Sequence, residues 1–130
     1  MRSDLIAYIK TLALGTFSLT EELPREESGV PLYLKNPKRI YVDKTVFTEE
    51  PLYDTLDGTD IHNEVQSITV YVAADSKTLP NNYDTVISSL RLGKNINNTL
   101  GFNKRECIVT TDYVDDVLVT ELEFRYTKLT

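Results

Sequence analysis

The chain has 130 residues, a length that suits one domain with a hydrophobic core of useful size. Its 14 Lys and Arg against 20 Asp and Glu give a formal net charge of −6. Because nucleic-acid binders gain affinity by neutralising phosphates, this surplus argues against tight binding of DNA or RNA, although an acidic surface lets DNA pass without sticking. Cys107 is the only cysteine, which excludes an intrachain disulfide. Its place in an apparent strand predicts a small core side chain.

The N-terminal segment carries apolar residues at spacings of three and four, as on one face of a helix. These residues are Leu5, Ile6, Ile9, Leu12 and Ala13. Ser3 can cap such a helix and Gly15 can end it, so we expect a helix over residues 3–14. Asp4 and Lys10 interrupt the apolar run, which makes it too polar for a leader or a membrane span. We therefore expect a soluble, unprocessed chain with no membrane partner.

Three strands are predicted next. Residues 17–23 alternate between apolar and polar side chains, residues 24–29 ("PREESG") form a turn or loop, and residues 30–34 ("VPLYL") resume an extended chain. A third strand is expected over residues 39–47, "RIYVDKTVF".

An acidic stretch from Glu49 to Glu64 contains no Lys or Arg. Its carboxylates are Glu49, Glu50, Asp54, Asp57, Asp60 and Glu64. Pro51 and Gly58 disfavour regular structure, so residues 49–60 are expected to be the least structured part of the chain. The whole net charge of −6 could be assigned to this stretch.

A long strand, residues 63–75, follows. It carries apolar groups on both faces, so we expect it in the middle of a sheet. Tyr83, Val86, Ile87 and Leu90 then fall at helical spacing and Gly93 closes the element, which predicts a helix over residues 80–92 packed on the sheet.

A closing hairpin is expected from Thr110 to Leu129, with its turn at Asp115-Asp116. Its second strand has one apolar face and one polar face. The apolar face is formed by Leu118, Thr120, Leu122, Phe124 and Tyr126, and the polar face by Glu121, Glu123 and Arg125. The predicted fold is a single α+β domain over residues 1–130, with one mostly antiparallel mixed β-sheet and two helices packed on one face, in the order α-β-β-β-β-α-β-β.

The sequence gives little support for a catalytic function. His62 is the only histidine, the five glycines are scattered singly, and no Gly-rich phosphate loop exists. Asp57, Asp60, His62 and Glu64 collect possible metal ligands, but their spacing matches neither an EF-hand nor a zinc motif. This group is either a solvated acidic loop, a weak divalent-ion site, or the carboxylates of a small hydrolase. We expect no enzyme and no cofactor.

Two basic clusters flank predicted strands: Lys35, Lys38 and Arg39 form one, and Lys104 and Arg105 the other. Each is a solvated strand end, a patch for an acidic protein partner or, in rare cases, a phosphate contact. These basic residues are candidate interface residues, because they could contact the acidic stretch of a neighbouring copy. The carboxylates from Glu49 to Glu64 are candidates for the same interface or for the lining of a lumen.

The order of the elements carries a resemblance. An N-terminal helix, a run of strands with a long excursion, the pair "SITVYVAADSKTLPNNYDTVISSLRLG" and the ending "VTELEFRYTKL" resemble the tail terminator (tail completion) proteins of long-tailed bacteriophages. In that family a strand with alternating β-branched residues precedes a polar turn and a helix, and the last strand is of the type "LEFRYT". The resemblance covers nearly the whole chain and is one of pattern.

The resemblance implies a structural subunit of the virion tail or neck, assembled in the host cytoplasm. Such subunits form a ring, expected to be a hexamer, that caps the head-proximal end of the tail tube and stops its polymerisation. The implied partners are further copies of the chain, the tail tube protein and the head-tail connector, with DNA only as passing cargo. Alternatives are a connector or neck protein, a tail tube protein, or a small acidic inhibitory module.

Overall fold

The computed structural model describes residues 1–15, 17–20, 39–54, 58, 60–75, 77, 79–96, 101–114 and 116–129. Within β3, β4 and β5, the side chains of Tyr53, Asp54, Asp60 and Val114 are not described. The turn expected over residues 24–29, the extended segment 30–34 and Asp115 lie outside this set.

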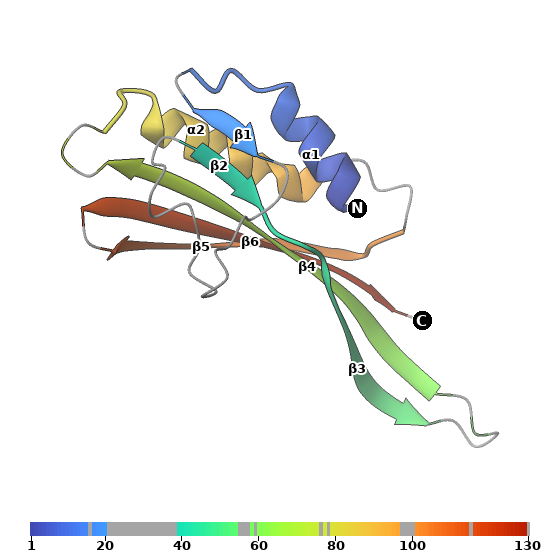
Figure 1. Ribbon diagram of the computed structural model, residues 1–130. Helices are drawn as coiled ribbons and strands as arrows, with labels where there is room; N and C mark the ends of the chain where they lie inside the picture. Colours follow the sequence, from blue (N-terminus) through green and yellow to red (C-terminus); the bar gives the residue numbers. More distant parts are fainter. Residues whose placement is uncertain are drawn as a thin grey trace.

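Six described strands form one mixed sheet in the order β1-β2-β4-β6-β5, and β3 pairs with β4 beside that path. The strands are β1 (Ser18–Thr20), β2 (Arg39–Val42), β3 (Val46–Asp54), β4 (Asp60–Asp75), β5 (Lys104–Val114) and β6 (Val117–Leu129). Of these pairings, β1 with β2 is parallel and the others are antiparallel. Helices α1 (Arg2–Lys10) and α2 (Tyr83–Arg91) lie on one face (Figure 1). This confirms the predicted α+β class.

Strand β4 is the centre of the sheet. It pairs with β6 along one edge, and with β2 and β3 one after the other along the opposite edge. One face of β4 packs into the main core, which the helices cover, through Ile68, Val70, Val72 and Ala74. Ala73 on its other face joins a second small cluster with Tyr41, Val117 and Val119. Apolar groups on both faces had indicated this mid-sheet position, and the prediction is confirmed.

The two helices contribute the expected core residues, but α1 is shorter than predicted. Leu5, Ile6 and Ile9 are buried, and so are Val86 and Leu90 of α2. Helix α1 ends at Lys10, where the Thr11 hydroxyl donates a 2.6 Å hydrogen bond to the carbonyl oxygen of Tyr8. The same carbonyl also accepts the backbone N–H of Thr11 at 3.0 Å, so both groups of Thr11 cap the helix end. Beyond the helix, Leu12 is only half-buried and Ala13 is exposed.

Gly93 has a different role from the predicted helix stop. It lies in η2 (Leu92–Asn95), a 3-10 turn that continues α2, and it is buried. A Cβ atom at this position would lie 2.8 Å from Leu5 Cδ1 and 3.2 Å from Phe124 Cε1. The glycine therefore permits close contact between η2, α1 and β6.

The closing hairpin has the predicted faces. The apolar set on β6 is buried, Glu121 is exposed, and Glu123 and Arg125 are half-exposed. Its first strand is longer than expected, because β5 already begins at Lys104.

The acidic stretch is not the loop that the sequence indicated. The expected single strand over residues 39–47 is two strands, and β3 continues to Asp54 through half of the region predicted to be least structured. Pro51 is compatible with β3 because an edge strand tolerates a missing N–H, and the register shifts between Pro51 and Tyr53. We call residues 46–54 and 60–67 the arm. Figure 1 shows that the arm projects away from the helices.

Candidate functional site

The arm holds most of the predicted acidic residues. Glu49 and Glu50 lie on β3 and, as neighbours in a strand, point to opposite faces of the arm. Asp54 and Asp60 are opposite each other in the register near the end of the arm. Their side chains, and all of Asp57, lie outside the described residues. The described carboxylates of the acidic stretch are thus divided between two faces of one β-ribbon, with Glu50 on one face and Glu49 and Glu64 on the other.

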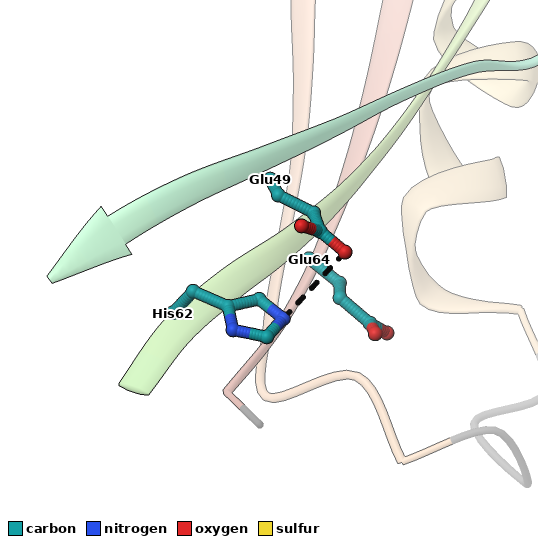
Figure 2. Close-up of side chains that lie close together, drawn as sticks. All are labelled: Glu49, His62 and Glu64. Atoms are coloured by element: carbon teal, nitrogen blue, oxygen red, sulfur yellow. Dashed lines mark ion pairs between the residues drawn. The ribbon is translucent and has the colours of Figure 1, made fainter. Parts of the chain in front are cut away.

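One face of the arm brings Glu49, His62 and Glu64 together. Glu49 and Glu64 are directly opposite each other across β3 and β4, and His62 is two residues from Glu64 on the same face. His62 Nε2 lies 3.7 Å from Glu49 Oε1. One ligand atom from each of the three residues lies within 4.8 Å of the others, and Figure 2 shows the side chains on one side of the two strands.

This group differs from the one expected from sequence. The predicted set joined His62 and Glu64 to Asp57 and Asp60, which are their neighbours in the chain. The structure instead adds Glu49 from the opposing strand. Only the register of the β3–β4 pair shows this, because Glu49 is distant from His62 in sequence.

The other face of the arm connects to β6. Arg125 Nη2 lies 3.4 Å from Glu50 Oε1, and Arg125 Nε lies 3.7 Å from Glu123 Oε1. Because these groups are substantially exposed, each pair contributes at most about 1 kcal/mol. Glu50 therefore has a local structural partner, in addition to its predicted place in an interface.

The arm also exposes large apolar side chains, which sequence analysis did not single out. Val46, Phe47 and Leu52 are 60%, 73% and 50% exposed. A hollow of about 330 Å³ lies beside Phe47 and is lined by Phe47, Thr48, Glu49, Glu64, Val65 and Gln66. An edge strand with exposed apolar groups is a ready surface for another chain.

A second open edge lies at the other side of the sheet. Within the described part of the chain, β5 pairs only with β6, so its outer backbone groups face no other strand. Ile108, Val109 and Tyr113 of β5 are exposed. Apolar and polar residues do not alternate regularly along β5, so the sequence did not indicate an exposed apolar edge.

The basic clusters are partly engaged within the chain. Lys104 Nζ forms a 3.0 Å ion pair with Glu106 Oε1, and Arg105 Nη1 donates a 3.3 Å hydrogen bond to the carbonyl oxygen of Ile96. Arg39 is exposed at the start of β2. Lys35 and Lys38 lie outside the described residues.

Cys107 lies in β5 and is partly buried against the main core, as the sequence predicted. Burial raises the pKa of its thiol, and the nearby Arg91 and Lys94 only partly oppose this effect. A raised pKa disfavours the nucleophilic thiolate. The environment of Cys107 thus fits a packing role.

Comparison with known proteins assigns no family. No family model matches the chain, and no curated protein sequence matches it. No helix among the described residues is long and apolar enough to cross a membrane.

Proposed function

We propose that the protein is a structural subunit that assembles head-to-tail into a closed ring, as tail terminators of long-tailed bacteriophages do. The ring would contain six copies, cap the head-proximal end of the tail tube, stop tube polymerisation and present a surface to the head-tail connector. The observation that carries the proposal is the presence of two unlike surfaces on one subunit, the projecting arm and the open edge of β5.

Two unlike surfaces are what a ring requires. In a head-to-tail assembly each copy uses one patch to bind a different patch of the next copy, and rotation closes the circle. The arm offers exposed Phe47 and Leu52, and β5 offers, beside Ile108 and Val109, outer backbone groups that pair with none of the described strands. Burial of such apolar groups and addition of a strand to an open edge are both common sources of protein affinity.

The charge distribution supports the same function. The arm carries carboxylates on both faces, so one acidic face can border a lumen while the other contacts a neighbour. An acidic lumen would repel DNA phosphates and let DNA pass without binding. The exposed Arg39 is a candidate contact for an acidic neighbour.

The test is the mass of the full chain in solution, measured by native mass spectrometry and light scattering over a range of concentrations. A discrete closed ring is expected. Open-ended polymers would favour the tail tube alternative. A monomer under every condition, and also in the presence of tube protein, would contradict the proposal and favour a free-standing module.

Two surface variants test whether the ring is head-to-tail. Phe47→Ser alters the arm, and Ile108→Lys places a charge beside the open edge of β5. Each variant alone should be monomeric, because each lacks one half of the same interface. Mixed, they should form pairs, since the intact edge of the first can bind the intact arm of the second. If each variant alone forms a stable dimer, the contacts are symmetric and a head-to-tail ring is excluded.

A further inference from the structure

We propose that Glu49, His62 and Glu64 form a binding site for a divalent transition-metal ion of the Zn²⁺ class, on the face of the arm shown in Figure 2. This inference does not depend on the proposed ring. It rests on the type of the three ligands, their spacing, the register of the strands and the hollow beside two of them.

The ligand types select the ion. An imidazole nitrogen favours zinc and its neighbours over magnesium and calcium, which prefer oxygen alone. Two carboxylates and a neutral imidazole also balance the charge of a divalent cation. Glu64 has Lys128 opposite it on β6, so one of the two carboxylates has a basic neighbour that competes with the ion. Because the carboxylates alone would also suit magnesium or calcium, it is the imidazole of His62 that selects a metal of the zinc class.

The spacing suits an ion held between the side chains. Zinc binds nitrogen and oxygen at about 2.0–2.2 Å in a tetrahedral arrangement, which places two ligand atoms roughly 3.3 Å apart. The observed distance from His62 Nε2 to Glu49 Oε1 is 3.7 Å, and all three ligand atoms lie within 4.8 Å of one another. Small side-chain rotations of the glutamates are enough to bring the three atoms onto one ion.

The register gives a physical reason for a cation at this position. Carboxylates directly opposite each other on adjacent strands repel and destabilise the pairing. Glu49 and Glu64 form such a pair. They lie close to the outer end of the arm, where residues 60–62 of β4 pair with β3 but with no other described strand. An ion bound by both would convert this repulsion into a cross-link between the two strands.

The hollow lined by Glu49 and Glu64 leaves one side of the site accessible. Its volume of about 330 Å³ accommodates water or a side chain from another molecule, next to Phe47 and Gln66. Three protein ligands and one accessible side are the arrangement of an open zinc site. The fourth ligand can therefore come from solvent or from a neighbouring molecule.

The first experiment is a calorimetric titration of the full chain with ZnCl₂, after treatment with a chelator and buffer exchange. Saturable binding of one ion per chain is expected, with much weaker binding of MgCl₂. His62→Ala, Glu49→Gln and Glu64→Gln should each weaken zinc binding at least about tenfold. Glu50→Gln is the matched control, because it makes the same change at the next residue but on the opposite face of the arm.

A spectroscopic readout locates the ion. His62 is the only histidine, so its imidazole proton signals in an NMR spectrum are unique. They should shift on addition of one equivalent of zinc, and they should shift equally in Cys107→Ser, which removes the only thiol. The circular dichroism of each metal-free variant checks that the variant is folded.

Four results would overturn the site: no saturable zinc binding, an unchanged His62 signal at one equivalent, equal losses in Glu49→Gln and Glu50→Gln, or equal binding of magnesium and zinc. Either of the last two would indicate a diffuse attraction of cations to the acidic arm.

Discussion

The hydroxyl group of Tyr126 on β6 donates a 3.1 Å hydrogen bond to the carbonyl oxygen of Gly93 in η2. The Tyr126 side chain is fully buried, with its ring near those of Phe102 and Phe124. The bond joins the end of the closing hairpin that is remote from its turn to the 3-10 turn after α2. Sheet and helical layer are therefore connected by a specific polar contact as well as by apolar packing.

Tyr126→Phe should lower the free energy of unfolding by about 0.5–1.5 kcal/mol, because it removes one of the two hydrogen bonds that the Gly93 carbonyl accepts and leaves only the bond from the Ile96 N–H. Urea unfolding measures the change. Tyr113→Phe removes a hydroxyl from an exposed tyrosine and should have little effect. Equal stability of the Tyr126 variant and the wild type would mean that the Ile96 N–H alone satisfies the Gly93 carbonyl.

Stability should fall at alkaline pH. Burial raises the pKa of Tyr126 far above its usual value of about 10, and the neighbouring Cys107 adds to the shift. Above about pH 10 the unfolded chain loses the tyrosine proton while the folded chain keeps it, so the free energy of unfolding decreases as pH rises. Below about pH 10, the stabilisation that comes from the protonated Tyr126 is fully present. Urea midpoints between pH 8 and 11 should decrease less steeply in Tyr126→Phe than in the wild type.

Gly93→Ala should destabilise the fold by about 1–3 kcal/mol, because its Cβ would lie 2.8 Å from Leu5 Cδ1. The cost should be smaller in a Leu5→Ala background, where the clashing group is absent. Thermal and urea unfolding of the single and double variants measure this coupling. If the losses of unfolding free energy in the two single variants simply add up in the double variant, the contact between Gly93 and Leu5 is not the cause of the destabilisation.

Leu122→Ala and Phe124→Ala should each cost about 2–5 kcal/mol, since both side chains are fully buried in the main core. Glu123→Ala lies between them on the opposite face and serves as the control, with an expected change of about 0.5 kcal/mol or less. Wild-type melting temperatures in the two core variants would indicate the wrong assignment of the faces of β6.

Charge reversal at Arg39, alone or with Lys38, should weaken assembly without affecting folding. Arg39 is exposed at the first residue of β2, so Arg39→Glu should change the unfolding free energy by about 0.5 kcal/mol or less. Sedimentation velocity measures the assembly constant, and Lys77→Glu, at an exposed turn, is a control with the same charge change. An unchanged constant would remove this basic cluster from the interface.

Periodicity was enough to predict the elements that bury one face. The helix faces around Leu5 and Leu90 and the two faces of β4 and β6 follow directly from spacings of three to four and of two. The arm was not predicted, because Pro51 and Gly58 indicate a break. The pairing of β3 with β4 outweighs that local signal, and an edge position tolerates the proline.

The candidate metal site could be predicted only in part. His62 and Glu64 are adjacent enough in sequence to be noticed together, but Glu49 joins them through a register that periodicity cannot supply. The exposure of Phe47 escaped notice for a related reason, since an apolar residue in a strand is ordinarily assigned to the core.

The position of β6 between β4 and β5 also has a consequence during synthesis on the ribosome. β6 pairs with β4 on one side and with β5 on the other, yet it is the last strand of the sequence. Until it emerges, β4 has only β2 and β3 as described partners and cannot bury Ile68 and Val70 against Phe124 and Leu122, their partners in the register. At about 5–20 residues per second the nascent chain exposes this apolar strand for several seconds.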